Sequence, residues 1–137
     1  MLLVDTNVLL DVLEDDPEWA RWSLRQLRAQ SQVHELAINA VIYAELSLAF
    51  DEIEALDECV DDLRLSLLEI PRPALFLAAR AYLGYRERRG PKMNVLSDFF
   101  IGAHASVLDC AIVTRDARRY RTYFPRVRLV TPQSTEE

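Results

Sequence analysis

The sequence predicts a single α/β domain over residues 1–137, with a mostly parallel sheet of about five strands and helices on both faces. Short β-like apolar runs alternate with longer stretches whose apolar residues recur at helical spacing. Half of the residues are apolar and 28% are charged, a composition typical of one globular core. No repeat or Gly/Ser linker divides the chain, and only residues 133–137 are expected to fray.

Strands that alternate with helices favour parallel pairing, and ligand sites in such sheets collect beyond the carboxyl ends of the strands. Pro17 and Pro73 suit the first turn of a helix, and Gly90 with Pro91 ends one. The expected strands are Leu2–Asp5, Glu35–Asn39, Ser66–Ile70, Ala111–Thr114 and Val127–Val130. The helices are expected at 7–13, 17–31, 39–49, 51–64, 73–89, 98–107 and 116–122.

The bulk features favour a cytoplasmic protein. No apolar run approaches the roughly 18 residues needed to cross a bilayer, and no basic leader precedes the first apolar run. Cys59 and Cys110 lack metal-ligand spacing and suit free thiols in a reducing compartment.

The charge is unevenly distributed along the chain. The total is −6, yet residues 1–63 hold three basic and fifteen acidic residues, whereas residues 64–137 hold thirteen basic and seven acidic ones. A basic C-terminal half could follow phosphates while acids elsewhere hold a metal ion.

Four acidic residues interrupt apolar patterns. Asp5 ends the first strand, Glu45 breaks an apolar helical stripe, and Asp116 follows the apolar run AIVT. Asp98 is expected in the first turn of a helix, with Ser97 as the N-cap. The three aspartates have a simpler explanation as helix caps or first-turn residues, but a carboxylate such as Glu45 on an apolar face is costly without a partner.

These acids could converge at one edge of the sheet, where a divalent cation would relieve their repulsion. An oxygen-only ligand set favours Mg²⁺ or Mn²⁺ over zinc. Neither His34 nor His104 has zinc-site spacing, and His104 suits a packed position.

The segments MLLVDTNVLLDVL, INAVIYAEL, LSDFFIGAHA and IVTRDARRY carry these four acids. Together they resemble PIN-domain nucleases and, more narrowly, VapC-type ribonuclease toxins of bacterial toxin–antitoxin pairs, and the resemblance covers nearly the whole chain. It implies a PIN-like α/β sandwich, a Mg²⁺- or Mn²⁺-dependent endoribonuclease, a homodimer, and a cognate VapB-type antitoxin that occludes the site.

Position 97 is Ser where many relatives have Pro. Some relatives place the fourth acid at the position of Arg119, so Asp116 is the candidate here.

The predicted reaction is hydrolysis of RNA phosphodiester bonds. Asp5 and Asp98 would bind the metal directly, with Glu45 and Asp116 as direct or water-mediated ligands. Residues expected to hydrogen-bond the acids or the attacking water are Thr6, Asn7 and Thr114, although a local turn role is an equal alternative for Asn7 and Thr114.

A basic run near the C-terminus is expected to contact RNA, because arginine binds phosphate and tyrosine can stack on an unpaired base. The expected RNA-binding residues are Arg115, Arg118, Arg119, Arg121 and Tyr120. A solvated helix with core aromatics is the alternative for this run. Trp19, Trp22, Leu24 and Leu27 could form an antitoxin groove, with core packing as the alternative.

Two other classes of protein remain open. One is a non-catalytic α/β module that uses the acids for structural metal binding or caps. The other is a phosphate-handling enzyme, such as a phosphohydrolase or a receiver domain. The first strand ends in DTN and lacks a DxD pattern, and the only lysine, Lys92, follows a helix-ending glycine.

Overall fold

The computed structural model describes residues 1–88 and 95–132, which form five strands and seven helices in the predicted order. The strands are β1 (Leu2–Val4), β2 (Leu36–Asn39), β3 (Ser66–Leu68), β4 (Ala111–Val113) and β5 (Leu129–Val130). The helices are α1 (Thr6–Leu13), α2 (Ala20–Ser31), α3 (Ala40–Ser47), α4 (Ile53–Asp62), α5 (Arg72–Glu87), α6 (Leu96–Leu108) and α7 (Arg118–Tyr123). The predicted α/β fold is confirmed, and the predicted elements differ mainly at their ends.

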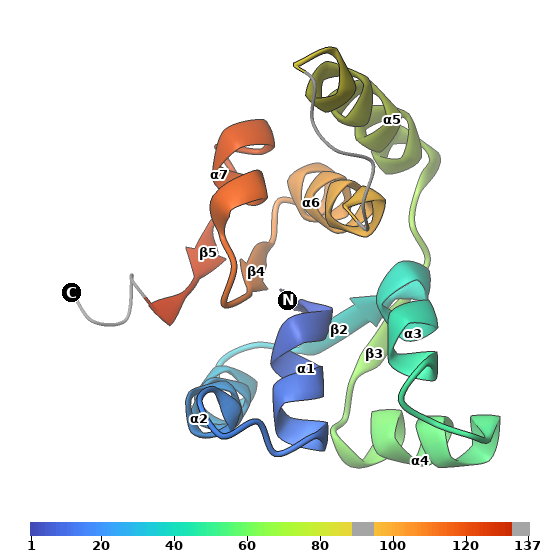
Figure 1. The fold of residues 1–137 in the computed structure, drawn as a ribbon, viewed down its shortest axis with the longest axis vertical. Helices are drawn as coiled ribbons and strands as arrows, with labels where there is room; N and C mark the ends of the chain where they lie inside the picture. The colour runs from blue at the N-terminus through green and yellow to red at the C-terminus, as the bar shows by residue number, and fades with distance from the viewer. Residues whose placement is uncertain (89–94, 133–137) are drawn as a thin grey trace.

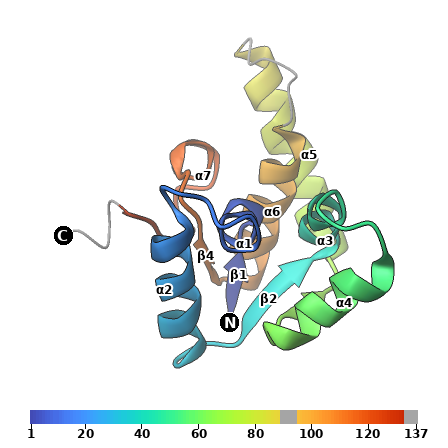
Figure 2. The same ribbon diagram turned by 60° about the horizontal axis from the view of Figure 1, so that its bottom comes forward.

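The sheet is entirely parallel, with strand order β3-β2-β1-β4-β5. Figure 1 shows α1, α2 and α4 on one side of the sheet and α5, α6 and α7 on the other. The turned view in Figure 2 shows β1 between β4 and β2. β1 lies beside both β2 and β4, so the direction of the crossovers reverses at this strand. A ligand site is expected in the crevice at the carboxyl end of β1, where the connections diverge to opposite faces.

The register brings particular strand ends together. Val4 pairs with Val113 and Leu3 with Ala37, so the residues after β1, β2 and β4 meet at one edge. β1 is fully buried, as expected for a central parallel strand covered on both faces.

The predicted start of the second helix is wrong. α2 begins at Ala20, because the carboxylate of Asp16 accepts hydrogen bonds from the backbone N–H groups of Glu18 and Trp19, each at 2.9 Å. These bonds form a turn that contains Pro17, so this proline precedes the helix.

The predicted N-cap of the sixth helix is also wrong. α6 begins at Leu96 after Val95, so Ser97 lies inside the first turn and provides no cap. Asp98 does lie in that first turn, as predicted. Pro73 lies in the first turn of α5, also as predicted.

Gly102 of α6 allows the segment after α7 to approach closely. A Cβ atom at this position would lie 2.3 Å from Cδ2 of Phe124. The absence of a side chain therefore lets the Phe124 ring pack on the backbone of α6, which fixes α7 beside it.

The remaining predictions concern membrane spans, the two cysteines and the segments around residues 90 and 133. No helix among the described residues is long and apolar enough to cross a bilayer. Cys59 and Cys110 are free thiols. The predicted helix end at Gly90 and Pro91 and the frayed segment 133–137 lie outside the described residues.

Candidate functional site

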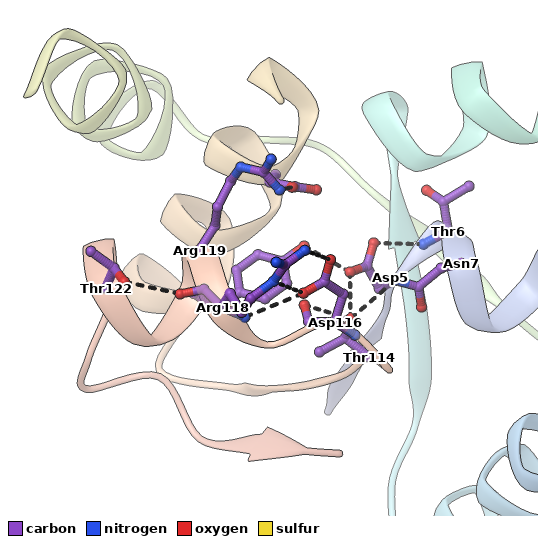
Figure 3. Close-up of polar contacts among 10 residues, drawn as sticks. Asp5, Thr6, Asn7, Thr114, Asp116, Arg118, Arg119 and Thr122 are labelled. Carbon is purple, nitrogen blue, oxygen red and sulfur yellow. Dashed lines mark hydrogen bonds and ion pairs between the residues drawn. The ribbon is translucent and has the colours of Figure 1, made fainter. Parts of the chain in front are cut away.

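Asp5 lies at the carboxyl edge of the sheet and is also the N-cap of α1. Its backbone N–H donates to the carbonyl of Val113 at 3.0 Å, which continues the pairing of β1 with β4. Its Oδ1 accepts from the N–H of Thr6, and its Oδ2 accepts from the hydroxyls of Thr114 and Tyr120, all at 2.8 Å (Figure 3). The residue is 4% exposed, and burial raises the pKa of Asp5 to about 6 although these hydrogen bonds lower it. The cap explanation and the site explanation are therefore compatible.

Glu45 is placed by the helix that follows β2. Asn39, the last residue of β2, caps α3 by accepting a hydrogen bond from the N–H of Ile42 at 3.0 Å. Glu45 lies one and a half turns further, where its Oε1 accepts from the hydroxyl of Thr6 at 2.7 Å. Thr6 thus connects two of the predicted acids, since its N–H donates to Asp5.

Asp98 projects from the first turn of α6 toward α7. Its Oδ2 accepts a hydrogen bond from Nη1 of Arg119 at 2.9 Å. The pKa of Asp98 is raised to about 7, mainly by burial and then by the negative charge of Asp5, with smaller contributions from Glu45 and Asp116; Arg119 opposes the rise. All four predicted acids therefore share one electrostatic environment.

Asp116 forms the outer part of this group. Arg118 donates to its two oxygens from Nε at 3.2 Å and Nη2 at 3.3 Å. The hydrogen bonds from Arg118 are the main reason that the pKa of Asp116 is below its ordinary value. Its backbone N–H donates to the hydroxyl of Thr114 at 3.1 Å, which ties the turn after β4 to the site.

The chemistry of these acids suits a hard divalent cation. They supply only oxygen ligands, and from the described residues Oδ1 of Asp5 accepts a single hydrogen bond, which leaves it a lone pair. A cation would also relieve the repulsion that raises the pKa of Asp98. However, within residues 1–88 and 95–132 no three His, Cys, Asp or Glu side chains are grouped closely enough to hold one ion. The side chains of Thr6, Arg118 and Arg119 bind Glu45, Asp116 and Asp98 instead, so coordination of one ion by several acids requires side chains to move.

The three predicted supporting residues all lie at the site. Thr6 and Thr114 contact Asp5 directly. Asn7 reaches it indirectly, because its Nδ2 donates to the hydroxyl of Thr114 at 3.2 Å, while its Oδ1 accepts from the backbone N–H of Arg115 at 3.3 Å.

Tyr120 follows the alternative given for its run, a helix with core aromatics, and the expected RNA contact is wrong for this residue. It was expected to stack on an RNA base, but it is 1% exposed and its hydroxyl donates to Asp5. A ring buried to this extent cannot stack on a base in this conformation. Alternation of arginine and tyrosine along the chain carried no sign of this contact, which depends on the packing of α7 beside α6.

Arg115 is held by a residue that sequence reasoning missed. Its Nε and Nη2 donate to both oxygens of buried Asp11 at 2.8 and 3.0 Å, and the hydroxyl of Ser23 donates to the same carboxylate at 2.9 Å. The guanidinium also lies over the ring of Trp19. The signal was available, since Asp11 interrupts an apolar helical pattern in the same way as Glu45.

A family model describing the PIN domain matches residues 2–125. The chain belongs to the PIN-domain family. Proteins of this family are generally nucleases that act on nucleic acid. Comparison of this PIN domain with curated protein sequences gives no match.

Several solved structures share the fold of this PIN domain. VapBC2 from Rickettsia felis, bound to a DNA fragment from its promoter, is 17% identical with a TM-score of 0.72, over 95% of this chain and 97% of that chain. VapBC-1 from nontypeable Haemophilus influenzae is 15% identical with a TM-score of 0.71, over 95% and 96%. FitAcB from Neisseria gonorrhoeae is 22% identical with a TM-score of 0.68, over 97% and 99%.

Proposed function

We propose that this PIN domain is a Mg²⁺- or Mn²⁺-dependent endoribonuclease and the VapC-type toxin of a toxin–antitoxin pair. The observation that carries the proposal is the pair Asp5 and Asp98, two mostly buried carboxylates from different PIN motifs. Burial is the main cause that raises the pKa of both; the negative charge of Glu45 adds to the rise at Asp5, and the negative charges of Asp5, Glu45 and Asp116 add to the rise at Asp98. Such perturbed acids in one crevice at the carboxyl ends of parallel strands are typical of a catalytic site.

The chain's own residues orient the acids for this reaction. Tyr120 and Thr114 both bind Oδ2 of Asp5, which leaves Oδ1 as the oxygen with ligand capacity. Thr6 donates its hydroxyl hydrogen bond to Glu45 and its N–H to Asp5, so it holds these two acids together. A divalent cation bound by Asp5 and Asp98, with Glu45 and Asp116 as further direct or water-mediated ligands, would polarise the scissile phosphate and lower the pKa of the attacking water.

Exposed arginines beside the acids supply contacts for an RNA phosphate. Arg118 and Arg121 project from α7 into solvent. The ion pair of Arg118 with Asp116 is exposed and screened by water, so Arg118 as well as Arg121 can bind phosphate. Arg115 is engaged by Asp11, so we assign it a mainly structural role at the edge of the RNA surface. Tyr120 acts in this proposal by holding Asp5.

A hollow that is lined by leucines and by polar and charged residues supports the proposed VapB-type antitoxin partner. Its volume is about 520 Å³, and Leu24, Leu27, Leu63 and Leu65 contribute to its lining. An amphipathic helix binds such a groove through its apolar face. The similar structures named above include toxin–antitoxin complexes. A homodimer and a cytoplasmic location complete the proposal, the latter consistent with two free thiols.

The test is cleavage of total RNA by purified, antitoxin-free protein with Mg²⁺ or Mn²⁺, beside an EDTA control. Asp5→Ala and Asp98→Ala should abolish cleavage, whereas Asp61→Ala, on the exposed face of α4, should retain it. Circular dichroism of each variant verifies folding. Cleavage that persists in EDTA or in both site variants would refute the proposal. If the wild-type chain neither cleaves RNA nor binds a divalent cation, a non-catalytic module is favoured.

A further inference from the structure

Helix α7 contacts three of the four site acids through three consecutive residues. The contacts are Arg118 with Asp116, Arg119 with Asp98, and Tyr120 with Asp5. In the close-up of Figure 3, Arg118 lies beside Asp116 while Arg119 extends away from it. The two arginines therefore have different acidic partners, although they are adjacent in sequence.

The two ion pairs differ in their exposure to solvent. The side chains of Arg118 and Asp116 are 87% and 41% exposed, whereas those of Arg119 and Asp98 are 32% and 26% exposed. Water screens the first pair strongly and the second pair less. The Arg119–Asp98 attraction is therefore the less screened of the two, and another ligand of Asp98 has to compete with it.

Arg119 and a divalent cation would compete for the same carboxylate. Arg119 binds Oδ2 of Asp98 at 2.9 Å, and its positive charge opposes the rise in the pKa of Asp98 that burial and the neighbouring acids cause. A cation on this carboxylate would lie within a few ångströms of the guanidinium, and like charges at such distances repel substantially when partly buried.

We propose that Arg119 is a displaceable internal counterion: it holds Asp98 before metal binding, and it turns toward the RNA phosphate when a divalent cation takes Asp98. The inference rests on the proposed metal-dependent nuclease function and adds a regulated order to that site. The arginine side chain is long and is 32% exposed, so it can rotate toward solvent without disturbing the core. Once released, it can bind phosphate through two parallel hydrogen bonds.

This exchange couples metal binding to RNA binding. Without metal, Arg119 is engaged and contributes little to RNA affinity. With metal, the same side chain becomes an additional phosphate ligand beside the acids. Because the coupling is thermodynamic, RNA that engages Arg119 should also favour metal binding.

The experiment compares Mn²⁺ affinity of wild-type protein, Arg119→Gln and Arg121→Gln by calorimetry without RNA. Arg121 lies on the same helix and is exposed, so its variant carries the same charge change without a change at Asp98. We expect Arg119→Gln to bind Mn²⁺ on the order of tenfold more tightly, because the competing charged hydrogen bond is gone. Arg121→Gln should remain within about twofold of wild type.

A second measurement uses the unaltered chain, so it does not depend on the folding of a variant. Side-chain NMR signals of Arg119 should shift when saturating Mg²⁺ is added. Equal or weaker Mn²⁺ binding by Arg119→Gln, or an unchanged Arg119 signal at saturating Mg²⁺, would overturn the inference. If RNA is still cleaved in that case, the nuclease proposal survives; if the wild-type chain binds no divalent cation, both fail.

Discussion

Replacement of Asp98 by Asn should stabilise the metal-free protein at alkaline pH although it abolishes the proposed activity. The pKa of Asp98 is raised from 3.8 to about 7, so the folded protein binds this proton more tightly than the unfolded chain. The stabilisation from protonated Asp98 is fully present below about pH 4, and it is lost as the pH rises through about 7. Asparagine carries no charge at any pH and can still accept the hydrogen bond from Arg119.

The magnitude follows from the shift. A change from 3.8 to about 7 corresponds to about 4 kcal/mol as an upper limit. Because the side chain is 26% exposed, we take about half of this, or about 2 kcal/mol. For 137 residues, this raises the Tm by about 7 °C at pH 8.5. The gain should fall to about half at pH 5.5, where folded Asp98 is mostly protonated.

The assay is thermal unfolding followed by circular dichroism in EDTA at both pH values. Asp61→Asn is the matched control, because Asp61 is exposed on α4 and the chemical change is the same. Its Tm should differ from wild type by less than about 2 °C. A gain for Asp98→Asn that does not exceed that of the control, or that is the same at both pH values, would refute the electrostatic reasoning.

Three further variants test the structure around the site. Gly102→Ala should lower stability by about 1–3 kcal/mol, since its Cβ would overlap the Phe124 ring; denaturant unfolding measures this, and a stabilised variant would contradict the packing. Arg115→Ala should cost about 2–4 kcal/mol in the same assay, because it leaves buried Asp11 without its counterion, and a cost below about 0.5 kcal/mol would argue against the pair. Tyr120→Phe should preserve the fold but weaken Mn²⁺ binding about tenfold, measured by calorimetry; unchanged affinity would exclude a positioning role.

Much of the site could be predicted from the sequence. Asp5 and Asp116 follow apolar runs short enough to be strands, and parallel pairing brings such strand ends to one edge. Glu45 was conspicuous because it interrupts an apolar stripe, and the structure gives it a hydrogen bond from Thr6. Their common location follows from local pattern combined with general rules of sheet topology.

The partners of the basic residues could not be predicted in this way. One basic and aromatic run contains Arg115 and Tyr120, yet Arg115 binds Asp11 within α1 whereas Tyr120 binds Asp5 at the N-cap of that helix. Arginine and tyrosine side chains are long, so sequence spacing does not restrict which group they reach. Their partners depend on the angle at which α7 packs on its neighbours, including the contact at Gly102.

The sequence by itself determined the order of strands and helices, the parallel sheet and the identity of the acids, because periodicity and turn chemistry are local properties. Only the tertiary structure decided the state of those acids. Burial and the proximity of three other carboxylates raise the pKa of Asp98, and Arg119 offsets part of that rise. Solvation and charge proximity depend on segments distant in sequence, so they exist only once the chain has folded.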